Sequence, residues 1–192
     1  QADKKDAKQS YVSIMNWFVF ACGFIFLATA LFKSEIAHVL IKKPEYFNHP
    51  DALIIVPILL LANLFLGIFF NLSIWYKINN KTLLGALISL FGAIITVVLL
   101  LVYVPEYGFK AAAYTTLISY FLMSVVSYFV GQYYYPVSYN IGRISVLLIT
   151  AIGMYLASEY LMKGMRQTVL LNLIFIAVYI SIGIWMNLRV RK

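Results

Sequence analysis

Charged residues are scarce in this sequence. Only 11% of its 192 residues are charged, against about a quarter in an ordinary soluble domain, whereas 63% are hydrophobic. A soluble fold of this size cannot bury so much apolar surface. The shortage of charge therefore excludes a soluble enzyme domain and a disordered tail, and it indicates that lipid surrounds most of the chain.

Cysteine and acidic residues are scarce as well. The single cysteine, Cys22, lies inside an apolar run, so the chain has no intrachain disulfide framework. Lys and Arg outnumber Asp and Glu by 15 to 7, and they stand between the apolar runs, where basic residues orient a membrane protein and meet lipid phosphates. Nucleic acid is therefore not expected as a partner. His38 and His49 share a polar loop without a metal-ligand pattern, and we expect neither a metal nor a cofactor.

The gaps between charged residues divide the chain into six apolar segments. A helix needs about 20 apolar residues to cross the hydrocarbon core, and five of the six gaps are long enough. The 15-residue gap between Arg143 and Glu159 suffices only if both charges lie at the interfaces, which predicts a span over 141–161. The other gaps lie between Lys8 and Lys33, Asp51 and Lys77, Lys81 and Glu106, Lys110 and Arg143, and Arg166 and Arg189. The sequence thus predicts an all-α membrane protein with six transmembrane helices.

The ends of the chain give an expected organisation and orientation. The opening QADKKDAKQS has neither a Met nor a signal pattern, so we expect 1–10 to be a cytoplasmic polar lead-in that is cut from within a longer polypeptide. Four helices are expected in 11–133, and two helices with a basic tail in 134–192. Six crossings place both ends on one side together with loops 77–81 and 136–143, and that side has the larger share of Lys and Arg. This bias predicts cytoplasmic ends.

Catalytic patterns are missing. The sequence has no H-E-x-x-H, no G-x-S-x-G and no glycine-rich phosphate loop followed by Lys, so an enzyme is not expected. The interiors of the spans also lack the carboxylate that an ion-coupled transporter usually needs. Acids and histidines for a transferase or polymerase could come only from the loop 33–51, which contains Glu35, His38, Glu45, His49 and Asp51.

Small and polar residues recur at helical spacing inside the spans. In the second span, Asn63, Gly67 and Asn71 share one face. Either these residues pack against another helix, or the two amides face a hydrated cavity and bind sugar hydroxyls. The sixth span has a similar series, for which packing is the first expectation: Asn172, Tyr179, Gly183 and Asn187.

Four basic residues beside the spans are candidate ligands of a head group. Lys77, Lys81 and Arg143 lie on the side predicted to be cytoplasmic, where they either set the orientation or attract a lipid-linked pyrophosphate. Lys110 precedes the fourth span on the opposite side, and it either neutralises a head group in the cavity or anchors the helix.

The segment NKTLLGALISLFGAIITVVLLLVYVPEYGFKAAAYTTLISYFLMSVV resembles the bacterial polysaccharide/oligosaccharide flippases. These are the O-antigen-type, lipid-linked oligosaccharide branch of the MATE-like multidrug/oligosaccharidyl-lipid/polysaccharide (MOP) exporter superfamily. In that family a Lys-Thr after one span is followed by a helix that ends in an IP-x-x-G turn, and the next helix starts with GAA-x-x-T-x-x-S-Y. The matching positions here are Lys81-Thr82, Val104-Pro105, Gly108, Ala111–Ala113, Thr116, Ser119 and Tyr120.

The resemblance covers about residues 8–190 and implies the last six helices of a longer carrier. Residues 11–133 would then supply four helices of its second lobe. The implied activity is movement of a polyprenyl-pyrophosphate-linked sugar across the bacterial inner membrane by alternating access, for cell-surface polysaccharide or lipopolysaccharide synthesis. The implied partners are the lipid-linked oligosaccharide, membrane lipids and the missing N-terminal helices. A cation-coupled multidrug antiporter of the same fold, a membrane-embedded transferase or polymerase of the same pathway, and a structural membrane subunit stay open as alternatives.

Overall fold

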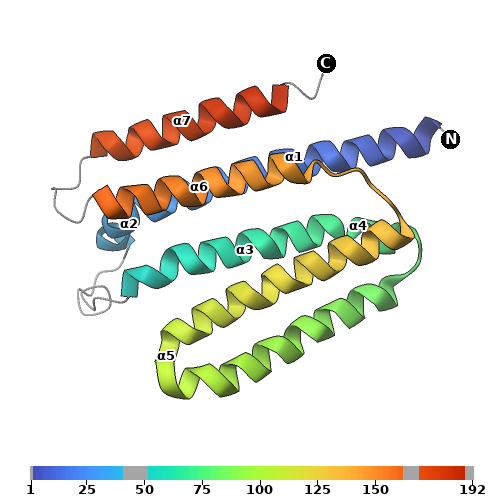
Figure 1. The fold of residues 1–192 in the computed structure, drawn as a ribbon, viewed down its shortest axis with the longest axis horizontal. Coiled ribbons are helices and arrows are strands. Elements are labelled where there is room, and N and C mark those ends of the chain that lie inside the picture. Colours follow the sequence, from blue (N-terminus) through green and yellow to red (C-terminus); the bar gives the residue numbers. More distant parts are fainter. Residues whose placement is uncertain (1, 41–51, 162–168, 189–192) are drawn as a thin grey trace. The chain divides into compact units, whose positions relative to one another are not determined.

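The protein is all-α throughout the part that the computed structural model describes, residues 2–40, 52–161 and 169–188 (Figure 1). The helices are α1 (Ala2–Leu31), α2 (Lys33–Leu40), α3 (Ile55–Leu72), α4 (Ile74–Ile78), α5 (Thr82–Tyr134), α6 (Ile141–Leu161) and α7 (Val169–Leu188), with a 3-10 turn at Ala52–Ile54. Within these residues, five helices are long and apolar enough to cross a membrane, and they make this a multi-pass membrane protein. The expected all-α, multi-span architecture is confirmed to that extent.

The expected spans and the observed helices agree in most places. α6 covers 141–161 as expected, and α7 lies within the predicted gap between Arg166 and Arg189. The expected lead-in 1–10 is helical from Ala2 and continues into the first span without a break. The sequence separates a third and a fourth span, and α5 contains both as two helical arms that meet at a kink.

The described residues divide into two compact units, each with its own helix packing. The first unit is Gln1–Val12 with Ile54–Ser138, and the second is Ser13–Leu53 with Tyr139–Lys192. The first unit therefore contains α3, α4 and α5, and the second contains α2, α6, α7 and most of α1. A functional division at residue 133 stays a prediction.

In the first unit, α5 turns back on itself at Gly108 (Figure 1). Its 53 residues would extend for about 80 Å if straight, far more than the roughly 30 Å of a hydrocarbon core. Gly108 has φ 61° and ψ −146°, a conformation that is essentially restricted to glycine, and Pro105 lies within the helix one turn earlier. The predicted VPEYG turn is therefore a sharp bend between two helical arms, 82–107 and 109–134, which correspond to the predicted third and fourth spans.

The two arms of α5 pack against each other and against α3. Ile88 of the first arm, Met123 of the second and Phe69 of α3 form a buried apolar cluster. Gly92 lies against the Met123 side chain, so the arms approach closely there. Ser124 also donates a hydrogen bond of 2.7 Å to the Phe65 carbonyl oxygen of α3.

In the second unit, α1 and α7 are antiparallel and meet along a seam of glycines and aromatic rings. The Phe20 and Tyr179 rings stack with centroids 5.8 Å apart, and the Tyr179 hydroxyl donates to the Phe20 carbonyl oxygen at 3.4 Å. Gly23 lies against the Tyr179 ring and Gly183 against the Phe20 ring, so a Cβ atom at either glycine would overlap with that ring. All four residues of the series on the sixth span are buried, and Asn172, Tyr179 and Gly183 contact α1, as the packing expectation requires.

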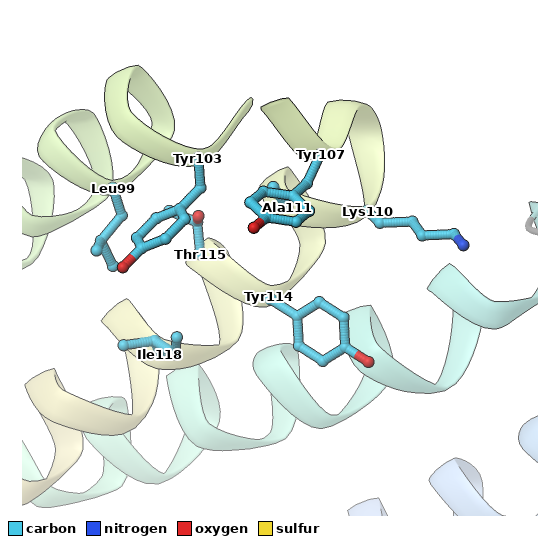
Figure 2. A pocket seen from close by; sticks show the side chains of 8 residues that line it. All are labelled: Leu99, Tyr103, Tyr107, Lys110, Ala111, Tyr114, Thr115 and Ile118. Carbon is cyan, nitrogen blue, oxygen red and sulfur yellow. The ribbon is translucent and has the colours of Figure 1, made fainter. Parts of the chain in front are cut away.

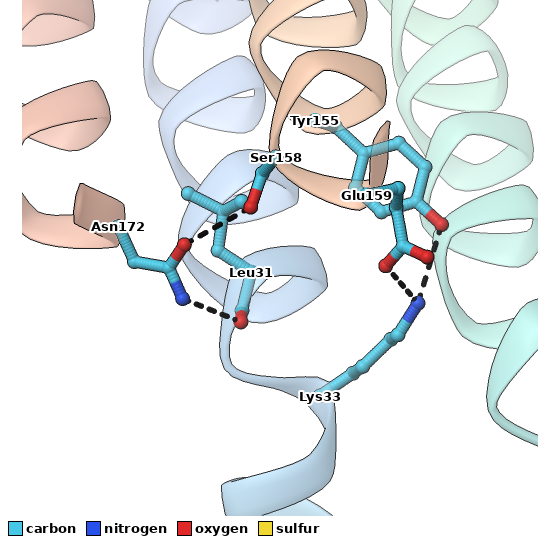
Figure 3. Close-up of polar contacts among 6 residues, drawn as sticks. All are labelled: Leu31, Lys33, Tyr155, Ser158, Glu159 and Asn172. Carbon is cyan, nitrogen blue, oxygen red and sulfur yellow. Dashed lines mark hydrogen bonds and ion pairs between the residues drawn. The ribbon is translucent and has the colours of Figure 1, made fainter. Parts of the chain in front are cut away.

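A closed polar layer ties α1, α6 and α7 together where α1 ends (Figure 3). Leu31 is the last residue of α1, and its carbonyl oxygen accepts a hydrogen bond of 3.1 Å from Asn172 Nδ2. Ser158 donates to Asn172 Oδ1, also at 3.1 Å. Each polar atom of the Asn172 amide thus has a partner in another helix, which we call the Asn172 layer.

An ion pair lies beside the Asn172 layer. Lys33, the first residue of α2, places its ammonium nitrogen 2.5 Å from a Glu159 carboxylate oxygen and 3.3 Å from the Tyr155 hydroxyl (Figure 3). Glu159 therefore lies near the end of the predicted span 141–161, and Lys33 of the same unit compensates its charge.

We predict that Gly108→Ala destabilises the protein by about 1–3 kcal/mol, because alanine strains the backbone at this φ and ψ. No atom lies within 4 Å of the added Cβ, so crowding does not contribute. Gly153→Ala on α6 is the matched control, since that glycine is equally uncrowded but has ordinary helical backbone; it should keep or slightly raise stability. Reversible unfolding in detergent measures both variants, and equal stability of the two would contradict the strain at Gly108.

We predict that Asn172→Ala costs about 1–2 kcal/mol, because it leaves the Leu31 carbonyl and the Ser158 hydroxyl without their hydrogen bonds. The control is Ser181→Ala on the same helix. The Ser181 hydroxyl is exposed and bonds only to Ala177 within α7, so its loss should change stability by less than about 0.5 kcal/mol. The same unfolding measurement applies, and an Asn172→Ala variant as stable as the control would show that the layer does not hold the helices.

Candidate functional site

A cavity of about 450 Å³ lies at the bend of α5, in the first unit (Figure 2). Its walls come from both arms, so residues on either side of Gly108 face one space. Its lining consists of Leu99, Tyr103, Tyr107, Lys110, Ala111, Tyr114, Thr115 and Ile118. We call this space the α5 cavity.

Three tyrosines give the α5 cavity its character. Tyr103 and Tyr107 lie one turn apart on the first arm, with ring centroids 6.4 Å apart, and Tyr114 lies on the second arm. All three side chains are between 47% and 59% exposed, so a large part of each ring is available for contact. The small Ala111 and Thr115 are buried on the second arm and leave room between the rings.

The α5 cavity combines apolar walls with a few polar groups. Tyrosine offers an aromatic face for packing and a hydroxyl that both donates and accepts hydrogen bonds. Lys110 adds a cation on a flexible stem, and in Figure 2 its side chain extends away from Tyr103. Such a lining fits a ligand that has apolar faces, hydroxyl groups and negative charge together, and the volume is within the range of about 300–1,000 Å³ that is usual for small-ligand sites.

The structure does not bring all the predicted cavity residues together. Lys110 lines the α5 cavity, but Asn63 and Asn71 lie on α3 and are not part of its lining. Asn63 Nδ2 donates to the Leu59 carbonyl oxygen at 2.8 Å, and Asn71 Nδ2 donates to that of Gly67 at 3.0 Å. Each amide is therefore bonded to its own helix. Asn63 is exposed, and whether its face of α3 packs or lines a cavity stays a prediction.

Lys81 belongs to an aromatic cluster at the opposite end of the α5 arms. Its ammonium nitrogen lies 3.7 Å from the centroid of the Tyr134 ring, and that ring stacks on Trp75 at 5.7 Å. Lys8 makes a similar contact with Tyr135 at 4.5 Å and donates to the Pro136 carbonyl oxygen at 2.7 Å. Aromatic rings with lysines at the ends of apolar helices are typical of a membrane–water interface.

The other candidate residues have separate positions. Lys77 is exposed in the last turn of α4, on the same side of the arms as Lys81. Arg143 lies in the first turn of α6, in the second unit. The role of both in lipid-phosphate binding stays a prediction.

The loop 33–51 is described only in part. Glu35 and His38 lie on α2, whereas Glu45, His49 and Asp51 fall outside the described residues. Among the residues described, no three His, Cys, Asp or Glu side chains gather as they would around a metal ion.

Sequence analysis missed the cavity role of the tyrosines. Tyr103 and Tyr107 lie near a predicted span end, where aromatic rings usually settle at the membrane interface. The available signal was their density, since three tyrosines and a lysine fall within 103–114 around the VPEYG turn.

Comparisons of the chain with models of known protein families, with curated proteins and with solved structures find no match. The geometry of the site and the chemistry of its residues therefore carry the functional argument.

Proposed function

We propose that this chain crosses a bacterial inner membrane six times as part of a MATE-like carrier that moves polyprenyl-pyrophosphate-linked sugars. The observation that carries the proposal is the α5 cavity, where three tyrosines and Lys110 line one space at the bend of an apolar helix. The resemblance of residues 80–126 to the oligosaccharide flippases supports the same reading. The proposal requires further apolar helices of the same carrier, which the gene would encode upstream of this sequence.

The chemistry of the cargo matches the lining of the α5 cavity. A sugar ring has an apolar face of C–H groups that packs on an aromatic ring, and hydroxyls that bond to tyrosine and threonine hydroxyls. The negative pyrophosphate would approach Lys110, and the polyprenyl chain would stay in the surrounding lipid. A volume of about 450 Å³ is sufficient for one or two sugar rings but not for the whole lipid.

Gly108 supports a carrier function because it offers a place where the two arms can change their angle. Hinges absorb large φ and ψ changes in a few residues, and glycine has the widest choice of both. Pro105 removes one backbone donor nearby, which leaves fewer helical hydrogen bonds to resist such a change. A change at the bend would alter the shape of the cavity that the two arms enclose.

We predict that Tyr107→Ala in the full-length protein lowers transport about tenfold, because it removes an aromatic contact worth about 1–1.5 kcal/mol. Tyr107→Phe should keep most of the activity if stacking dominates, and Lys110→Gln should lower it. Transbilayer movement of a polyprenyl-pyrophosphate-linked sugar in proteoliposomes measures the rate.

The control for these variants is Tyr160→Ala, at the exposed end of α6 and far along the chain from the α5 cavity. It should transport at the unchanged rate. If Tyr107→Ala and Lys110→Gln transport as well as this control, the α5 cavity is not the cargo site.

Asn63 and Asn71 lie outside the α5 cavity, and the proposed carrier would turn their face of α3 toward its hydrated path. We therefore predict that Asn63→Leu and Asn71→Leu lower transport but leave the melting temperature unchanged. Both amides are bonded to their own helix, so leucine removes a polar group without breaking a contact between helices. Thermal unfolding and the proteoliposome assay separate the two effects. A lower melting temperature with normal transport would return both asparagines to a packing role.

A further inference from the structure

Four polar side chains of the second unit have buried atoms without a hydrogen-bond partner in the described part of the chain. One is Glu35 on α2, and the other three come from α1, α6 and α7. Asn16 is 2% exposed and neither its Oδ1 nor its Nδ2 is paired within the described part of the chain. Asn187 is 4% exposed and its Nδ2 is unpaired there, as is the buried Nη1 of Arg143. A buried amide or guanidinium without a partner is costly, so these atoms need an explanation.

The helix contacts place these three residues at one level. α1 and α7 are antiparallel, and Leu31 contacts Asn172. Asn16 lies fifteen residues before Leu31 and Asn187 fifteen residues after Asn172, so the two asparagines are level. α6 and α7 are also antiparallel, and Ser158 meets Asn172, so Arg143 is level with Asn187 by the same count.

The third pair of helices agrees with this register. α1 and α6 run in the same direction, because Phe26 contacts Tyr155 and Lys33 contacts Glu159. These contacts pair residues whose numbers differ by 129 and by 126. A difference of 127, which lies between the two, pairs Asn16 with Arg143. The contacts of the three helix pairs therefore agree on one layer, which we call the Asn16 layer, about 22 Å along the helices from the Asn172 layer.

The three side chains also lie on the inward faces of their helices. Asn16 precedes Phe20 and Gly23 of the α1 seam by four and seven residues. Arg143 precedes the fully buried Leu147 and Ala151 of α6 by four and eight residues. Asn187 continues the buried series of α7, four residues after Gly183.

The Asn16 layer has more donors than acceptors. A charged guanidinium and two amide groups donate, whereas the unpaired carbonyl oxygen of Asn16 is the acceptor known to be available. The helix α6 also begins here, capped by a 3.1 Å hydrogen bond from the Arg143 backbone N–H to Asn140 Oδ1, which adds a partial positive charge. In the Asn172 layer, by contrast, donors and acceptors match within the protein.

We propose that the Asn16 layer binds an anionic phosphoryl group. Such a group offers several acceptor oxygens, which bond to guanidinium and amide donors. If one of its oxygens is protonated, that hydroxyl donates to the Asn16 side-chain carbonyl oxygen; otherwise a water bridges the two oxygens. Arginine is the preferred partner because its planar fork matches two phosphoryl oxygens. The phosphoryl group could belong to a lipid head group or to free phosphate. This site is independent of the proposed transport function, since the α5 cavity belongs to the other unit.

The test is ligand-dependent thermal stability of the purified full chain in a neutral detergent, with tryptophan fluorescence as the signal. Inorganic phosphate and dihexanoyl phosphatidic acid are titrated separately against chloride at constant ionic strength. We expect the melting temperature to rise and saturate, as it does when a ligand binds only the folded state. A rise with phosphatidic acid alone identifies a lipid head group, and a rise with both identifies the phosphoryl group itself.

The variants decide whether the Asn16 layer is responsible. Arg143→Gln should weaken the apparent affinity for the probe about tenfold or more, because it removes charge-assisted hydrogen bonds. Lys8→Gln, at a lysine of the first unit that donates to the Pro136 carbonyl oxygen, should leave the affinity unchanged. Asn172→Ala should lower the melting temperature without changing the ligand-dependent shift.

Asn187→Leu keeps the proposal testable if Arg143→Gln does not fold. It removes an unpaired buried donor, so it should raise the melting temperature without ligand and reduce the ligand-dependent shift. No shift with either probe would overturn the proposal. A shift that is equal in Arg143→Gln and Lys8→Gln, or one that Asn187→Leu leaves unchanged, would show that the ligand binds elsewhere and that the layer is only an imperfectly packed part of the seam.

Discussion

Polar atoms on apolar helices must find partners inside the protein, because hydrocarbon offers none. This requirement explains most of the side-chain hydrogen bonds of the described residues. Many polar side chains bond to the carbonyl four residues earlier in their own helix, which satisfies a donor without any neighbour; these include Asn63, Asn71, Thr96, Thr116 and Ser181. Others bond where a helix stops, as Ser73 does at the end of α3 and Asn172 at the end of α1. A polar group that follows neither route is then a candidate for function.

The same requirement determines how far the sequence predicts the fold. A long stretch without charge is what lipid demands of a helix, so the charge gaps predict α6 and α7 almost to the residue. The breaks are harder to predict. Pro105 and Gly108 announce the bend of α5, but no proline or glycine marks the end of α1 near Phe32 or of α3 at Ser73. At the end of α3 the Ser73 hydroxyl bonds locally to the Phe70 carbonyl oxygen, whereas at the end of α1 the bond comes from Asn172 of another helix and forms only on folding.

The candidate site was predictable only in part, because a site depends on which faces meet. Lys110 is visible in the sequence as a cation beside a span. The cavity role of Tyr103, Tyr107 and Tyr114 depends on how the two α5 arms pack, and that packing depends on contacts such as Gly92 with Met123, thirty-one residues apart in the chain. The Asn16 layer is still less visible, since its members come from the first helix and the last two. Only the directions of these helices show that the three residues share a level.

The seam between α1 and α7 explains why polar atoms of the Asn16 layer stay unpaired while those of the Asn172 layer are paired. The Tyr179 ring fills the space that Gly23 leaves, and the Phe20 ring fills the space at Gly183, so rings interlock with glycines at the middle of the seam. The hydrogen bonds of Asn172 fix the register at one end. With its middle interlocked and one end bonded, the seam cannot slide to let Asn16, Arg143 and Asn187 pair differently. Donors held apart in this way retain their need for acceptors, which distinguishes a preorganised anion site from a packing defect that could collapse.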